Sequence, residues 1–130
     1  MSGETDLEKV LSSMEIDCDD VAYGLASTDN EIIHPETTLG TLIEAEGKTV
    51  IASMEYMQAH GLEAEGPFAK LTILVHTSLE LVGLTAVLAT KLAEIGVSAN
   101  VFAGYYHDHI FVQYDRKDEA IKALLEFKKS

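Results

Sequence analysis

The sequence has no tryptophan, two prolines, a single cysteine and few basic residues. With Cys18 as the only cysteine, an internal disulfide is excluded, which favours a reducing cytoplasm. No apolar run approaches the about 20 residues of a membrane-spanning helix. Residues 1–20 lack the basic and apolar regions of a secretory signal. We therefore expect a cytoplasmic chain without a membrane span.

The scarcity of basic residues limits the partners. There are 9 lysines and arginines against 22 acidic residues, a formal net charge of −13. Such a chain repels nucleic-acid phosphates and anionic lipid headgroups, so we expect no nucleic-acid partner and no membrane partner. The 130 residues, 47% of them hydrophobic, suit one compact domain or two small subdomains that share a core.

Motifs of catalysis are also missing. The sequence contains no C-x-x-C, H-E-x-x-H, G-x-S-x-G or phosphate-binding glycine loop. Cys18 has no neighbouring base in the sequence that would make it a nucleophile. We therefore expect no catalytic residue, no cofactor and no enzyme activity.

The second half of the chain has a clear periodicity. Alternating apolar residues predict strands over 71–75, 97–103 and 110–114. Leu84, Leu88, Leu92 and Ile95 lie on one stripe of a helix that Gly96 ends, and Asp115 can cap a last helix. A crossover through the first helix would make the next strand a parallel neighbour of the first. This βαββα order needs one more strand to complete a ferredoxin-like sheet, and the first half must supply it.

The first half predicts several short elements. Two runs split by Glu46-Gly47 indicate a hairpin, although a helical turn over 39–46 is an alternative. The other expected elements are a helix opened by Thr5 or Asp6, a strand over Val21–Leu25, a polar loop over 27–38, a helix over 54–60 ending at Gly61, and entry to the long strand at Gly66-Pro67.

Three segments resemble a known family: EAEGKTVIAS (44–53), VHTSLELVGLTA (75–86) and AGYYHDHIFVQ (103–113). They resemble the ACT domain, a small ligand-binding regulatory module of amino-acid metabolism. More closely, the chain is similar to small bacterial stand-alone tandem ACT-like proteins of unknown function. It is more distantly similar to cytosolic arginine sensors built from ACT units. The resemblance covers roughly residues 1–128, and Thr77, Leu81 and Gln113 are mild departures from the family's pattern.

The resemblance implies an α+β fold, ferredoxin-like βαββαβ, in two tandem units with antiparallel sheets and helices packed on one face. The units would be an N-terminal degraded ACT-like unit at 1–64 and a C-terminal ACT-like unit at 65–130. It also implies a regulatory or sensor protein without catalysis that binds a small molecule, with an amino acid as the leading class. Apolar residues on both sheet faces predict a homodimer or a higher homo-oligomer.

In ACT domains effectors bind where the first strand meets the first helix, and here that loop is 76–84. The candidate ligand-binding residues are His76, Thr77, Ser78, Leu79, Glu80, Val82, Gly83 and Leu84, with Ser98 and Asn100 on the next strand. With Gly83 at the start of the helix, the free backbone amides there would be open to a ligand carboxylate. Thr77 or Ser78 could instead simply cap that helix. Glu80 could receive a ligand ammonium group or face solvent.

The run Tyr105-Tyr106-His107-Asp108-His109 allows other readings. His107 and His109 are two residues apart on a strand and share a face, so with His76 they would make a plausible zinc site. A metal-dependent enzyme is therefore one alternative, and a purely structural assembly module is another. The two tyrosines could line a pocket or only pack at the turn. We assign no metal ligand.

Overall fold

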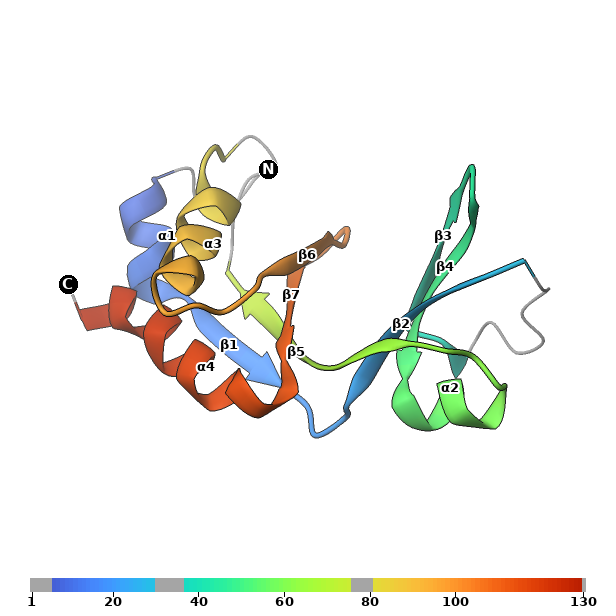
Figure 1. The fold of residues 1–130 in the computed structure, drawn as a ribbon. Coiled ribbons are helices and arrows are strands. Elements are labelled where there is room, and N and C mark those ends of the chain that lie inside the picture. Colours follow the sequence, from blue (N-terminus) through green and yellow to red (C-terminus); the bar gives the residue numbers. More distant parts are fainter. Residues whose placement is uncertain (1–5, 30–36, 76–80, 130) are drawn as a thin grey trace. The chain divides into compact units, whose positions relative to one another are not determined.

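The computed structural model describes residues 6–29, 37–75 and 81–129. The chain forms two compact units, which we call the terminal unit (residues 1–19 and 70–130) and the central unit (residues 20–69) (Figure 1). The sequence units expected at 1–64 and 65–130 are a different division and stay a prediction. None of the described helices is long and apolar enough to cross a membrane.

The terminal unit combines both ends of the chain. Its elements in chain order are α1 (Leu7–Ser13), β1 (Glu15–Cys18), residues 70–74 of β5 (Glu65–Leu74), α3 (Leu84–Glu94), β6 (Asn100–Ala103), β7 (Asp108–Gln113), the 3-10 helix η2 (Tyr114–Arg116), α4 (Lys117–Leu125) and the 3-10 helix η3 (Glu126–Lys129). Asp6 opens α1, because its carboxylate accepts hydrogen bonds from the amides of Glu8 and Lys9.

The sheet of the terminal unit has the strand order β1-β5-β7-β6. β1 runs antiparallel to β5, with Ile16 opposite Ile73, and supplies the strand that the second half of the sequence lacks. β6 and β7 form the expected antiparallel hairpin, with Val101 opposite Ile110. The expectation that the strand after α3 lies beside β5 was wrong. β7 occupies that place and β6 is the edge strand, which begins at Asn100 rather than at residue 97.

The core of the terminal unit lies between this sheet and the helices α1, α3 and α4 (Figure 1). The apolar stripe expected on α3 is confirmed, since its three leucines are buried. The buried hydrophobic residues of this layer are Val10, Met14, Leu71, Ile73, Leu84, Leu88, Leu92, Val97, Ile110, Val112, Ala120, Ala123 and Leu124. Phe111 points to the other face of the sheet and packs edge to face on Phe102. Strand alternation on β5 and β7 and the four-residue spacing on α3 thus point to one common layer.

α3 ends at a glycine, as expected. Gly96 has φ 74°, which glycine adopts without the steric cost of a side chain. The amides of Gly96 and Val97 donate to the carbonyl oxygens of Ala93 and Leu92, each at 3.0 Å. This pattern satisfies carbonyls that the end of a helix would otherwise leave open.

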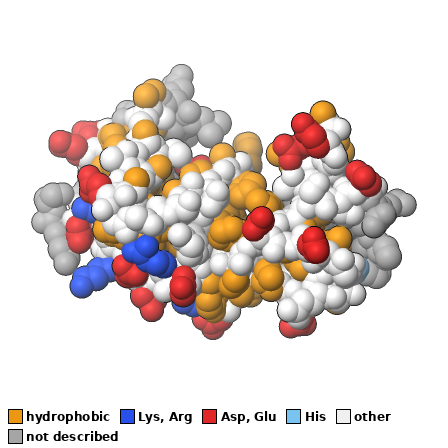
Figure 2. Space-filling model, in the orientation of Figure 1, with side chains coloured by type: hydrophobic (Ala, Val, Ile, Leu, Met, Phe, Trp, Pro, Cys, Tyr) orange, Lys and Arg blue, Asp and Glu red, His pale blue; other side chains and the backbone are white. Residues whose placement is uncertain are grey.

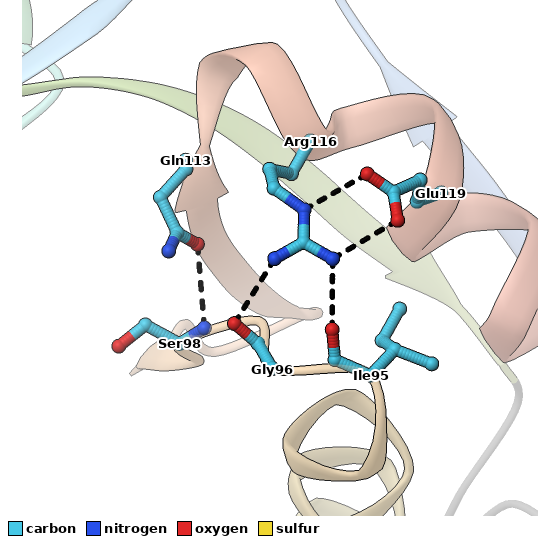
Figure 3. Close-up of polar contacts among 6 residues, drawn as sticks. All are labelled: Ile95, Gly96, Ser98, Gln113, Arg116 and Glu119. Atoms are coloured by element: carbon cyan, nitrogen blue, oxygen red, sulfur yellow. Dashed lines mark hydrogen bonds and ion pairs between the residues drawn. The ribbon is translucent and has the colours of Figure 1, made fainter.

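Arg116 joins the end of α3 to the start of α4 (Figure 3). Its guanidinium donates to the carbonyl oxygens of Gly96 at 3.1 Å and Ile95 at 2.7 Å. It also pairs with both carboxylate oxygens of Glu119, at 2.8 and 2.9 Å, and lowers the pKa of that carboxyl group. The expected cap at Asp115 was wrong, because η2 comes first and Arg116 is the N-cap residue of α4.

The two ends of the terminal unit that border the central unit lie close together. Asp19 and Lys70 form an ion pair with an Nζ–Oδ2 distance of 3.4 Å. They are the last and first residues of the two segments that make up the terminal unit. The chain therefore leaves this unit and returns to it at neighbouring points.

The central unit is a smaller sheet with one helix. It contains β2 (Tyr23–Thr28), β3 (Gly40–Glu44), β4 (Gly47–Ser53), α2 (Met54–Ala59) and residues 65–69 of β5, in the strand order β3-β4-β2-β5. β3 and β4 pair antiparallel, so the hairpin reading is confirmed over the helical turn at 39–46. Its core consists of Ala26, Val50, Ala52 and Met57.

Gly24 allows α2 to pack closely on β2. A Cβ atom at Gly24 would lie 2.6 Å from Met54 Sδ and 3.0 Å from Ala64 Cβ. Any side chain there would therefore displace the packed residues.

We expect Leu88→Ala to lower the free energy of unfolding by about 2–5 kcal/mol, because it removes a fully buried side chain from the layer between α3 and the sheet. Urea denaturation measures this. The matched control is Thr90→Ala, at an exposed position of the same helix, which should change stability by no more than about 0.5 kcal/mol. Equal effects of the two substitutions would contradict the orientation of α3.

Arg116→Met should lower the thermal midpoint more than Glu119→Gln does. The methionine leaves the carbonyls of Ile95 and Gly96 without their donor, whereas the glutamine removes only the charge of the ion pair. Differential scanning calorimetry compares the two. If the glutamate variant is the less stable one, the ion pair rather than the carbonyl contacts connects the two helices.

Candidate functional site

A hollow of about 290 Å³ lies in the terminal unit between the end of β5, the start of α3 and the β6–β7 turn. It is lined by Val75, Leu81, Gly83, Leu84, Thr85, Ala86, Gly104, Tyr105, Tyr106, His107 and Asp108. Gly83 at the start of α3 and the polar residues of the β6–β7 turn therefore line the same hollow.

One wall is the first turn of α3. Gly83 is the N-cap residue, with φ 96°, and it has no side chain that could accept a bond from the first amides of the helix. The first turn of α3 also contains no acidic residue, although the chain is rich in them. This end of α3 therefore keeps the partial positive charge of its helix dipole, which favours an anionic group.

Gly83 is needed for its backbone angle rather than for space. A Cβ atom there would meet only Leu7 Cδ2, at the ordinary contact distance of 3.7 Å. Residues with side chains rarely adopt φ 96°. A substitution at Gly83 therefore strains the backbone, whether or not a ligand is bound.

The opposite wall is the β6–β7 turn. The amide of Gly104 donates to the carbonyl oxygen of His107 at 2.9 Å and closes the turn. Tyr105 and Tyr106 are each 82% exposed, and their rings meet edge to face with centroids 4.9 Å apart. Asp108 follows as the first residue of β7. The turn thus offers aromatic surface and a carboxylate next to the helix start.

The two histidines of this region have different surroundings. His109 Nδ1 lies 2.9 Å from Thr72 Oγ1 on β5, a hydrogen bond within the sheet. Burial lowers the pKa of His109, the charges of Lys70 and His107 lower it further, and Asp108 opposes them. His107 lines the hollow, and its buried Nδ1 atom has no hydrogen-bond partner among the residues that the structure describes. His107 is therefore the histidine with an unused polar atom.

Among the residues that the structure describes, no three His, Cys, Asp or Glu side chains are grouped as metal ligands. The zinc alternative also needed His76, which lies outside the described residues. The three-histidine site stays an alternative that the described residues do not test.

The structure brings together only part of the candidate ligand site. Gly83 and Leu84 line the hollow, whereas Val82 is 85% exposed beside it. The amide of Ser98 donates to Gln113 Oε1 at 3.3 Å (Figure 3), and Asn100 Nδ2 donates to the carbonyl oxygen of Phe111 at 3.3 Å. Neither residue lines the hollow. The remaining candidates lie outside the described residues: His76, Thr77, Ser78, Leu79 and Glu80.

Several lining residues were not among the candidate ligand-binding residues, although the sequence did allow Tyr105 and Tyr106 to line a pocket. They are Val75, Leu81, Thr85, Ala86, Gly104, Tyr105, Tyr106, His107 and Asp108. The order of the strands and helices along the chain could have predicted these residues. In a strand-helix-strand-turn sequence each element reverses direction, so the start of the helix and the hairpin turn fall at the same end of the sheet.

We expect folding stability to decline as the pH falls below about 6.5, in part through His109. Because the folded pKa is lowered, the unfolded chain binds this proton first. The contribution is thus full above the unfolded pKa and is lost as the pH falls towards the folded pKa. Urea unfolding at about pH 7.5 and about pH 5.5 should show a smaller pH effect in His109→Asn than in the wild type. The same pH effect in both proteins would contradict it.

Comparisons with known proteins agree with this architecture. ACT-domain models match residues 63–126 and residues 2–69. A Vibrio cholerae protein of unknown function, described as a candidate transport protein, is 43% identical, with 94% of this chain and 95% of that one covered and a TM-score of 0.85. No curated protein matches the chain significantly.

Two more distant structures show the same fold. An Agrobacterium tumefaciens protein is 12% identical over 88% of this chain and 89% of that one, with a TM-score of 0.73. A candidate C-terminal regulatory domain of aspartate kinase from Porphyromonas gingivalis is 11% identical over 92% and 99%, with a TM-score of 0.58. The expected resemblance and the ferredoxin-like α+β fold are confirmed, and the chain belongs to the ACT-domain family.

Proposed function

We propose that this chain is a regulatory or sensor protein without catalytic activity that binds an amino acid in the hollow at the start of α3. ACT domains are commonly small-molecule-binding regulatory domains. The observation that carries the proposal for this chain is the start of α3, where Gly83 provides no capping side chain and the first turn opens into the hollow.

The chemistry of the walls supports this ligand class. The amides of the first turn of α3 suit a carboxylate, and Asp108 across the hollow suits an ammonium group. At about 290 Å³ the hollow is at the lower end of ligand-pocket volumes, which favours a molecule of amino-acid size. The candidates from the sequence that line it are Gly83 and Leu84.

We also propose that the protein acts in the cytoplasm and self-associates as a homodimer or higher homo-oligomer. The single unpaired Cys18 supports a reducing compartment. Self-association is supported by large apolar side chains at the surface: Val21, Leu39, Leu42, Ile43, Leu74, Val82, Tyr105 and Tyr106. Because the proposed protein has no catalytic group, its ligand can act only by binding one arrangement of the protein more tightly than another.

Thr85→Glu tests the ligand site without weakening the helix. Thr85 is exposed, lines the hollow and lies in the first turn of α3, where a carboxylate is favourable for the helix itself. The new charge would compete with the ligand carboxylate. We expect an amino acid found by thermal-shift screening to bind this variant at least about tenfold more weakly in calorimetry.

Thr90→Glu is the matched control, because Thr90 is exposed on the same helix and does not line the hollow. It should keep the affinity within about twofold. Equal losses in both variants would contradict the site, and no stabilisation by any amino acid would favour a purely structural module. Gly83→Val is less informative, because the strain at φ 96° would lower binding and stability together.

A further inference from the structure

The imidazole ring of His109 connects two strands on the face of the sheet that points away from the helices. His109 lies two residues before Phe111 on β7, so both side chains are on that face. Towards β5, its Nδ1 atom lies 2.9 Å from Thr72 Oγ1. Towards β6, the ring lies next to Gly104, because a Cβ atom at Gly104 would be 3.4 Å from Nε2 and 3.6 Å from Cδ2. The ring therefore lies between β5 and the end of β6.

Gly104 is the residue that connects this ring with the hollow. It follows β6, begins the β6–β7 turn and lines the hollow, whereas His109 does not line it. A Cβ atom at Gly104 would lie 2.9 Å from the carbonyl oxygen of His107, closer than a side chain comes to backbone. Only glycine therefore lets the chain approach both this carbonyl and the imidazole. The base of the turn thus packs against His109.

Thr72 fixes the rotation of the same ring. Its side chain is buried at 8% exposure, and the other buried side chains in the described part of the chain are hydrophobic. Valine has nearly the same shape and would fill this place without needing a hydrogen-bond partner. The hydroxyl group instead makes a directional bond with His109 Nδ1, and a buried polar pair of this kind favours one geometry over others. The pair therefore holds the base of the turn in one position relative to β5.

This bond matters for the hollow because it joins the segments that form two of its walls. Val75 directly follows β5 and lines the hollow three residues after Thr72, and residues 104–108 line it from the turn. Figure 2 shows basic side chains gathered over the terminal unit, but no lysine or arginine is among the described residues that line the hollow. The proposed binding therefore relies on backbone amides and Asp108. Such contacts are strongest when the spacing of the walls is fixed before the ligand arrives.

We propose that the Thr72–His109 pair is a clamp that positions the β6–β7 turn for the binding of an amino acid in the hollow. Both are positioning residues, because neither contacts the ligand and each acts through the turn. The clamp rests on the ligand site proposed above. The two proposals can fail separately, since the opening of the turn is measurable without any ligand.

Amide hydrogen exchange of the full chain, followed by NMR without ligand, tests the clamp. The amide of Gly104 donates to the carbonyl oxygen of His107, so its exchange reports the opening of the turn. We expect Thr72→Val to speed this exchange at least about fivefold, and to change the hydrogen-bonded amide of Val97 less. Thr41→Val, the same substitution at an exposed position of β3, is the matched control and should leave both amides unchanged. Unchanged exchange at Gly104 in Thr72→Val would overturn the proposal.

A double variant separates positioning from stability. Thr72→Val alone leaves His109 without this partner, whereas Thr72→Val/His109→Phe replaces both partners by apolar groups of similar shape and should restore most of the thermal stability. We expect the amino acid that most stabilises the wild type in a thermal-shift screen to bind both variants at least about tenfold more weakly in calorimetry. Affinity that recovers together with stability would overturn the proposal, because the pair would then only stabilise the fold. A wild type that no amino acid stabilises contradicts the proposed function instead, and exchange at Gly104 then still supports or overturns the clamp.

Discussion

The pairing of β1 with β5 is the contact on which the terminal unit depends. The second half of the chain has strands and helices for most of a ferredoxin-like sheet, but β5 would remain at an open edge without β1. β1 covers that edge with backbone hydrogen bonds and places Ile16 beside Ile73 over the buried layer. A segment from the start of the chain thereby completes a unit built mainly from its end.

The position of the hollow follows from the same topology. β5 and β6 both lead towards the end of the sheet where α3 begins and where the β6–β7 turn lies. The glycine that starts α3 and the turn with Tyr105 and Tyr106 therefore face each other, although about 20 residues separate them in the sequence. The start of α3, which has no capping side chain, therefore lies next to the β6–β7 turn.

Periodicity predicted the elements of the second half well, because buried faces impose spacings of two and four residues. The leucines of α3, the stop at Gly96 and the β6–β7 hairpin follow from such local rules. The strand at Glu15–Cys18 was missed, since four residues with a half-exposed pattern carry little signal. The place of β6 at the edge depends on pairing between distant segments, which local spacing does not specify.

The candidate site was predictable in part for a related reason. Gly83 and Leu84 were found because the resemblance to ACT domains points to the loop between the first strand and the first helix. Ser98 and Asn100 make contacts elsewhere in the unit. The backbone amide of Ser98 donates to the side chain of Gln113, and the side-chain amide of Asn100 donates to the backbone of Phe111. Those bonds depend on strand register. The lining residues of the β6–β7 turn could be predicted only by following the direction of each strand and helix through the whole unit.

The ion pair between Asp19 and Lys70 marks a narrow neck in the chain path. Everything between these residues forms the central unit, so one compact module is inserted within another between two adjacent points. A single, partly exposed ion pair adds little stability by itself. The β1–β5 ladder holds the two points together, and the entropic cost of closing the inserted segment grows only slowly with its length. The inserted module can therefore lengthen, shorten or change its own edge with little effect on the module that contains the hollow.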